Sequence, residues 1–481
     1  MNRTWIRLSE HDALLLVVCL AQFMVILDVS VVNVALPVMR TGLHFSTTGL
    51  QWVVNAYTIT FAGFLMLGGR SADLLGRRRV FIAGTALFAF SSLACALADS
   101  RGLLLGARAL QGFGGAIVSP ATLSIITTSL PDGRERNRGL AAWGAVGGLG
   151  ASTGALLGGA LTQTLGWPAI FAINVPVGVA VIALALHTIP LDARRDGRRH
   201  FDLAGALLMT GGLVGLTYGI VRTNALGWGS TGVLVPLAVA VALLGSFLYV
   251  ENRSQAPLVP LSIFRLGQLR TANLVVVLMY FSMFSSFFFI TLYLQQVLHD
   301  NALQAGLSFL PMTLAVFTGS TLAARLVARF GLRIAVSTGM LLSTTGLALL
   351  TGMHPGGDYA TVVLPGAVVA GLGMGIGLVS STIAATQGVP RQQSGLASGL
   401  LNTSRLFGGA LGLAVLSTVA ASAGRSAQGL QALTDGFGQA LTVGAVVTLA
   451  AAVLAMTALQ RRPRPEAVPE AVIASEHATA A

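Results

Sequence analysis

The chain has 481 residues, of which 54% are hydrophobic and only 10% are charged. A soluble protein of this length carries roughly 25% charged residues, whereas apolar segments long enough to cross a bilayer, about 20 residues each, recur here from end to end. All 29 basic residues are arginine, and the missing lysine excludes a nucleotide-binding P-loop and lysine Schiff-base chemistry.

The composition predicts an all-α, polytopic membrane protein with no enzymatic activity, no metal site and no bound cofactor. Cys19 and Cys95 both fall inside expected spans and are too few for a disulfide framework or a zinc site. A net charge of +12 would suggest a nucleic-acid partner in a soluble protein. Here arginines on cytoplasmic loops account for the charge, so no nucleic-acid partner is expected.

Fourteen apolar segments are expected to span the membrane. The polar start, "MNRTWIRLSEHD", is followed by no cleavage site, so the first apolar run is interpreted as a retained span. The expected spans are 13–37, 50–69, 80–98, 102–130, 139–163, 168–190, 202–222, 232–251, 271–298, 304–330, 333–353, 360–387, 394–421 and 435–459. With a cytoplasmic N-terminus, 23 arginines fall on cytoplasmic connections and four on outer loops. This bias predicts that both termini are cytoplasmic.

The first span holds one carboxylate, Asp28, within "FMVILDVSVVNVALP". An aspartate at membrane depth costs about 2.5–3.5 kcal/mol on insertion scales, which makes it a candidate functional residue. Arg108 in the fourth span lies at comparable depth, about 9–14 Å from the outer helix ends, and is the expected partner. Burial disfavours the charged carboxylate and a guanidinium favours it, so Asp28 could take up and release a proton. The alternative is a permanent pair that only locks two helices.

Polar residues recur at helical spacing on the second and fourth spans. The second span carries Gln51, Asn55 and Thr58, and the fourth continues from its arginine to Gln111 and Ser119. These stripes are expected to line a water-accessible substrate cavity. The alternative is interhelical hydrogen bonding, worth about 0.6 kcal/mol for each bond.

The fifth span, "WGAVGGLGASTGALLGGAL", carries glycines that include Gly150, Gly154, Gly158 and Gly159. Small residues at this spacing let helix backbones approach closely, so a helix-packing role is expected. A functional interpretation adds that helices can rock against such a smooth, close-packed surface. The same surface would block leakage through the protein between its states.

Further candidate cavity residues lie in the ninth and thirteenth spans. Phe289, Tyr293 and Gln296 belong to the aromatic run "YFSMFSSFFFITLYLQQ", which suits an amphipathic, often cationic, organic ligand, although some of its aromatics must face lipid. Asn402 and Arg405 belong to "LLNTSRLFGGALG". A charge near mid-membrane is a candidate functional group, so Arg405 is expected to contact an anion or substrate, or to act as a gating partner.

An internal repeat divides the chain. The segment "GRSADLLGRRR" after the second span is similar to "ARLVARFGLR" after the tenth. Gly76 aligns with Gly331 at an offset of 255 residues. The expected organisation is an N-terminal six-helix half (1–190), two inserted spans (191–251), a C-terminal six-helix half (252–459, with a cytoplasmic linker at 252–270) and a disordered cytoplasmic tail (460–481). Many secondary transporters are built from such parallel repeats.

Together these segments resemble the major facilitator superfamily, and particularly its fourteen-span drug:proton antiporter family, from the first span nearly to the tail. "LDVSVVNVALP" and "LLLGARALQGFGGA" resemble the family's first-span and fourth-span motifs, which implies proton coupling through Asp28 with Arg108 beside it. "GGRSADLLGRRRV" resembles the superfamily's loop motif, which controls the conformational switch; the matching residues are Gly69, Asp73, Gly76, Arg77 and Arg78.

Some positions depart from the family pattern. Ala155 follows Gly154 where the fifth-span motif usually has proline, Leu74 stands where the loop motif often has arginine, and Pro168 replaces the usual arginine after Trp167.

The resemblance implies a monomeric exporter of amphipathic small molecules, such as drugs, antibiotics and antiseptics, in the cytoplasmic membrane of a prokaryote. It would work by alternating access and be driven by the proton gradient, with the bilayer, protons and substrate as its partners. One alternative is a dedicated exporter of a single endogenous metabolite or lipid on the same fold. Another is a non-transporting sensor or partner protein.

Overall fold

The computed structural model describes residues 10–131, 134–190, 203–254, 257, 261–265, 268–387, 389, 394–423 and 429–459, and every regular element within them is a helix. The first part of the chain forms α1 (Glu10–Gly42), α2 (Thr47–Leu75), α3 (Arg77–Ala96), α4 (Arg101–Ser129), α5 (Arg134–Leu165), α6 (Ala169–Ala172) and α7 (Asn174–Thr188). Two helices follow, α8 (Leu203–Leu226) and α9 (Thr231–Arg253). The last part forms η1 (Leu261–Arg265), α10 (Leu269–Leu292), η2 (Tyr293–Val297), α11 (Ala302–Ser308), α12 (Leu310–Phe330), α13 (Leu332–Leu350), η3 (Tyr359–Val363), α14 (Leu364–Thr386), α15 (Ser394–Ala423) and α16 (Gly429–Ala458).

The predicted all-α membrane fold is confirmed. In the described part of the chain, thirteen segments are long and apolar enough to cross a membrane. Four of these crossings join two helices each: α6 with α7, α10 with η2, α11 with α12, and η3 with α14. The remaining expected span is α5, whose 32 residues extend about 48 Å at 1.5 Å per residue. Each of the fourteen expected spans therefore corresponds to a helical crossing.

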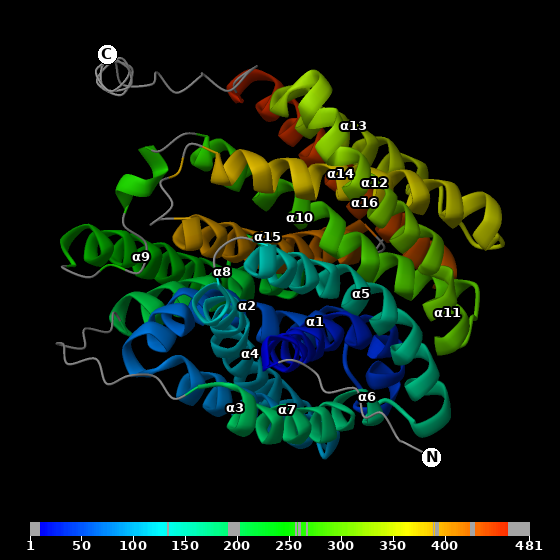
Figure 1. Cartoon of the computed structure of the whole chain (residues 1–481). Coiled ribbons are helices and arrows are strands. Elements are labelled where there is room, and N and C mark those ends of the chain that lie inside the picture. The colour runs from blue at the N-terminus through cyan, green and yellow to red at the C-terminus, as the bar shows by residue number, and fades with distance from the viewer. Residues whose placement is uncertain are drawn as a thin grey trace, which may run out of the picture.

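The crossings fall into two groups. The first helix group includes α1, α3, α4, α6 and α7, in the lower part of the view in Figure 1. The second helix group includes α10, α12, α13, α14 and α16, in the upper part. The groups meet where α2 packs on α15 and where α5 packs on α11, and α8 contacts both α2 and α15. We call the end of the bundle at which α1 begins the first end, and the opposite end the second end.

The same kind of one-residue connection between helices occurs twice, once in each part of the chain. Gly76 joins α2 to α3 with φ of 99°, and Gly331 joins α12 to α13 with φ of 83°. Both angles lie in the left-handed region, which glycine adopts without steric cost. These are the two glycines aligned in the sequence repeat, so the backbone supports the repeat.

The glycines of α5 bring its backbone against α1. A Cβ atom at Gly154 would lie 2.5 Å from Cβ of Ser30, and one at Gly158 would lie 2.7 Å from the carbonyl oxygen of Val31. Real Cβ atoms do not approach so closely, so any larger residue would push α5 away from α1. Close backbone approach of this kind is how membrane helices pack without a hydrophobic driving force.

Two further glycines extend this packing. A Cβ atom at Gly150 would lie 3.0 Å from the Ile26 side chain on α1. A Cβ atom at Gly159 would collide with the carbonyl oxygen of Ala302 on α11. The glycine face of α5 therefore contacts both groups of helices at the second end.

Some predicted features fall outside the described residues. They are the tail at 460–481, parts of the linker at 252–270, and the side chains of Asp73, Leu74 and Ala155.

The packing of α5 on α1 gives a first prediction. Gly158→Leu would overfill this contact, at a cost of about 1–3 kcal/mol for overpacking, and should lower the thermal midpoint of the purified protein. Gly106→Leu is the matched control, because Gly106 is exposed and nothing lies within 4 Å of an added Cβ atom. Equal midpoints for the two variants would contradict the prediction.

Candidate functional site

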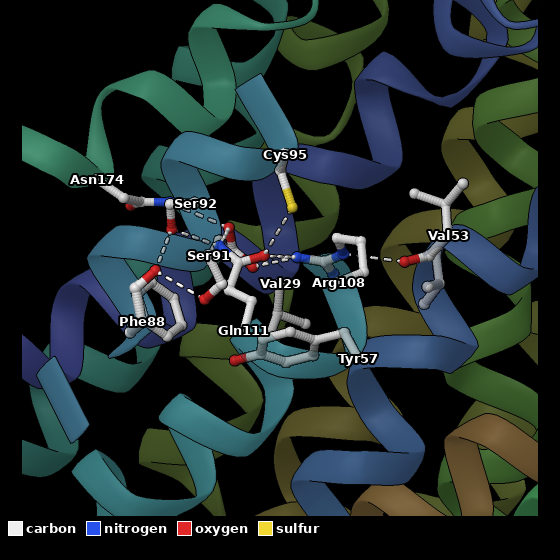
Figure 2. A network of polar contacts seen from close by, with 12 residues as sticks. Val29, Val53, Tyr57, Phe88, Ser91, Ser92, Cys95, Arg108, Gln111 and Asn174 are labelled. Atoms are coloured by element: carbon white, nitrogen blue, oxygen red, sulfur yellow. Dashed lines mark hydrogen bonds and ion pairs between the residues drawn. The ribbon is translucent and has the colours of Figure 1, made fainter. Parts of the chain in front are cut away.

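The centre of the first helix group holds a buried ion pair. Arg108 Nη1 on α4 lies 2.6 Å from Asp28 Oδ2 on α1, and the two side chains are 1% and 0% exposed. Sequence reasoning had placed both residues at the same membrane depth, and the structure brings them into direct contact. The polar network around them is drawn in Figure 2.

The other carboxylate oxygen of Asp28 accepts two amide hydrogen bonds. Gln111 Nε2 donates from 2.7 Å and Asn174 Nδ2, the first residue of α7, donates from 3.1 Å. Gln111 also donates to Ser92 Oγ on α3 at 2.7 Å and accepts from Arg108 Nη1 at 2.6 Å. Four helices, α1, α3, α4 and α7, therefore converge on one carboxylate.

The guanidinium of Arg108 is held on its other sides by α2 and α6. Its Nε donates to the carbonyl oxygen of Val53 at 3.0 Å. Its Cζ lies 4.4 Å from the ring centroid of Tyr57 and 5.6 Å from that of Phe171. Cation–π contacts are strongest when desolvated, as they are here, so this arginine is fixed in position.

This geometry suits an ionised Asp28. The arginine and both amide groups donate to its two oxygens, so none of these contacts accepts a carboxyl proton as it stands. Proton uptake would remove the charge that balances Arg108 and would require one donor to move away. The arrangement can therefore convert a change in protonation into a change in helix contacts.

Ser92 and Asn174 were missed by sequence reasoning. Asn174 belongs to the segment "GWPAIFAINVPVG", and nothing in the sequence alone indicates that its side chain faces α1. A polar side chain at the start of an apolar run was the available signal, because an asparagine amide in a membrane span needs a partner.

The stripe on α2 is buried. Gln51 and Asn55 are each 0% exposed and Thr58 is 1% exposed. The Thr58 hydroxyl donates to carbonyl oxygens of its own helix, whereas neither amide atom of Asn55 has a hydrogen-bond partner in the part of the chain that the structure describes. On α4, Ser119 is 4% exposed. Their role as cavity-lining residues stays a prediction.

Two aromatic residues expected in the cavity have contacts within the protein. Phe289 is 1% exposed and packs on Phe288 and Phe437. Tyr293 donates its hydroxyl proton to the carbonyl oxygen of His354 at 3.0 Å. These two aromatics thus pack inside the second helix group.

Gln296 lies at the second end, where it joins the two groups. Its Oε1 accepts a hydrogen bond from Arg40 Nη1 at the end of α1, at 3.0 Å. The adjacent Gln295 donates to the carbonyl oxygen of Val34 at 2.7 Å. Together these two hydrogen bonds hold α1 to η2.

On α15, Asn402 and Arg405 are both half-buried. Arg405 Nη2 donates to Thr382 Oγ1 on α14 at 2.8 Å, and its Cζ lies 6.0 Å from the ring centroid of Tyr280 on α10.

The loop motif lies at the first end. Arg77 Nε donates to Ser124 Oγ on α4 at 2.8 Å, and Arg78 Nη2 donates to the carbonyl oxygen of Leu186 on α7 at 2.6 Å. Gly69 faces Pro120, whose Cβ would lie 3.5 Å from an added Cβ atom. The described contacts of this motif thus hold α2 and α3 to α4 and α7.

Comparison with known proteins identifies the family. The model of the Major Facilitator Superfamily matches residues 18–413. The chain belongs to this superfamily.

Relatives of this superfamily member include a cephamycin export protein of Amycolatopsis lactamdurans, 41% identical over 93% of this chain and 92% of that protein. A multidrug resistance protein of Mycobacterium tuberculosis is 34% identical over 84% of this chain and 74% of that protein. Among solved structures, an auto-inhibited peptide transporter superposes with a TM-score of 0.66 at 16% identity, covering 94% of this chain and 98% of that one. The last likeness confirms the fold.

The buried pair gives a second prediction. In this transporter, Arg108→Met should cost about 3–5 kcal/mol because it leaves Asp28 buried without its charge partner. Asp28→Asn together with Arg108→Met should cost less than the sum of the single changes, because neither charge is then stranded. Thermal midpoints of the four proteins measure this coupling, and Arg101→Met at the exposed start of α4 is the control. Additive losses would show that the pair is not coupled.

Asn174 gives a third prediction. Asn174→Leu removes one donor to Asp28 while it keeps the branching and the number of side-chain heavy atoms, and should cost about 1–3 kcal/mol. The loss should shrink when Asp28→Asn is also present, because the carboxylate that needs the donor is gone. Thermal midpoints test this, and an equal loss in both backgrounds would mean that Asn174 only fills space.

Proposed function

We propose that this chain exports amphipathic small molecules, including drugs and antibiotics, in exchange for protons. It would act as a monomer in the cytoplasmic membrane of a prokaryote, with both termini cytoplasmic, and it would need no bound cofactor. The observation that carries the proposal is the buried carboxylate of Asp28, held by Arg108, Gln111 and Asn174. Family membership supports it, as do one relative named for cephamycin export and another named for multidrug resistance.

Asp28 would carry the coupling proton. Each proton that crosses 100 mV supplies roughly 2.3 kcal/mol, before any contribution from a pH gradient. Protonation would leave the Arg108 guanidinium without a counter-charge at 1% exposure. Such a stranded charge costs several kcal/mol, so α1 and α4 would shift until water or another group restores its balance.

Alternating access would require the two helix groups to separate at the second end. There Arg40 and Gln296 share one hydrogen bond, and Gln295 and Val34 share another. A hydrogen bond contributes roughly 0.5–3 kcal/mol net, with bonds to charged groups at the upper end. Two of them contribute roughly 1–6 kcal/mol, the same order of magnitude as the roughly 2.3 kcal/mol that each proton supplies across 100 mV.

A narrower specificity is the second candidate. The 41% identical relative is named as the exporter of one class of compound, cephamycin, whereas the 34% identical relative is named for multidrug resistance. Dedicated export of a single compound would use the same proton site. The breadth of compounds transported distinguishes the two.

A proteoliposome experiment gives the fourth prediction. Under an imposed pH gradient, wild-type protein should transport a fluorescent lipophilic cation and release protons in the opposite direction. Asp28→Asn should abolish the gradient-driven flux, because the amide cannot exchange a proton. Arg222→Gln, a change at an exposed arginine near the end of α8, is the control and should transport normally.

Each outcome has a distinct meaning. Equal flux in wild type and Asp28→Asn would reduce Asp28 to a structural partner of Arg108 and overturn the coupling proposal. No flux in either folded protein would favour a dedicated cargo, to be sought by testing metabolites. If no compound in such a panel moves, the chain is not an exporter.

A further inference from the structure

Arg405 is a membrane-depth cation with no carboxylate beside it. It is the twelfth residue of the 30-residue helix α15, about 17 Å from the first end of that helix at 1.5 Å per residue. Its guanidinium donates to the Thr382 hydroxyl, and its buried Nε has no hydrogen-bond partner within the described ranges. Of the two arginines placed near mid-membrane, Arg108 has a counter-charge and Arg405 has none among the described residues.

The carboxylates of the second helix group cannot neutralise it. Residues 269–459 contain three, Asp300, Asp358 and Asp435, and all of them lie at the second end, 18 residues of α15 away from Arg405. Asp358 accepts hydrogen bonds from the hydroxyl and backbone N–H of Thr361 and from a neighbouring backbone N–H, which hold its pKa below the usual value. The Asp435 carboxylate accepts a hydrogen bond from a glutamine of its own helix.

One aromatic side chain of α10, Tyr280, lies beside the cation, and two more continue the same helix face. Tyr280, Phe284 and Phe287 recur at i, i+4 and i+7, so they share one face of the helix, and each is half-buried. The Tyr280 ring lies 6.0 Å from the guanidinium. Phe284 packs against Gly409, one turn further along α15. A cation beside a partly accessible aromatic face suits a molecule that has one anionic group and an apolar body.

We propose that Arg405 binds the carboxylate of an amphipathic organic anion, with Thr382 fixing the guanidinium and the α10 aromatics contacting the apolar part. An arginine is suited to this role because its fork of N–H donors matches a carboxylate and keeps its charge at every physiological pH. A bound anion would also supply the counter-charge that the surrounding protein lacks. The inference rests on the proposed export function and assigns one substrate class to it.

A series of one ring system with three charges tests the proposal. Pyrenebutyrate, its methyl ester and pyrenebutyltrimethylammonium are titrated against the protein in phosphatidylcholine nanodiscs, with empty nanodiscs as the blank. Arg405→Gln should weaken pyrenebutyrate binding by about 10-fold or more, the size expected for a lost charge-assisted hydrogen bond. It should leave the ester and the ammonium compound within about 2-fold.

Two variants accompany it. Arg405→Lys keeps the charge and should retain most of the pyrenebutyrate binding. Arg222→Gln removes an exposed arginine that also stacks on a tyrosine, Tyr218 at 5.0 Å, and should change nothing. The lysine variant keeps the test decisive if the glutamine variant does not fold, because loss of acid binding in a folded Arg405→Lys protein would contradict a charge-based site.

Other results would overturn the proposal. Equal weakening of pyrenebutyrate and methyl ester binding would show that Arg405 shapes the site without recognising the carboxylate charge. Unchanged acid binding in Arg405→Gln would exclude the site. Abolition of acid binding by phosphatidylglycerol in the nanodiscs would identify a lipid phosphate as the occupant, and displacement by millimolar inorganic phosphate would indicate a general anion site.

Flux measurements separate this inference from the proposed function. If Asp28→Asn stops transport of both charged compounds while Arg405→Gln stops neither, export is proton-coupled and the anion site is wrong. If Arg405→Gln stops only pyrenebutyrate transport, both proposals hold. If wild type transports neither compound and no other, the export function itself fails.

Discussion

A charge pair in a medium without water is the constraint on which this structure depends. Asp28 and Arg108 are almost completely buried, and neither could remain ionised alone at that depth without a cost of several kcal/mol. Together they are tolerated only because amide donors and a backbone carbonyl occupy their remaining hydrogen-bonding positions. Four helices are held in register by this requirement, so the polar centre is both the candidate site and a structural element.

Close packing keeps that centre in place. On its other side α1 rests on α5, where Gly154 and Gly158 allow backbone contact, and the same glycine face continues to α11 in the other helix group. A displacement of α1 would therefore change the packing of α5 on α11, at the interface between the groups. In the proposed coupling, proton exchange at Asp28 would act on the two groups through this one helix.

The sequence predicted the spans and the comparable depth of Asp28 and Arg108 because both follow from apolar length and residue counting along single helices. It did not predict which faces of different helices meet. Asn174 was missed because its partner lies 146 residues away, on another helix. Phe289 and Tyr293 were expected at a cavity, yet their contacts lie inside the second helix group, because an apolar aromatic serves equally well as core or as ligand contact. Gln296 accepts a hydrogen bond from Arg40 on α1, and this pairing depends on where the ends of two helices lie in space.

The complete enclosure of Asp28 has a consequence for energy conservation. The Asp28 side chain is 0% exposed, and its two oxygens accept hydrogen bonds from Arg108, Gln111 and Asn174. In this conformation the carboxylate is closed to the solvent on both sides of the membrane. An idle transporter resting here would not short-circuit the membrane, and the gradient would be consumed only when the helices move.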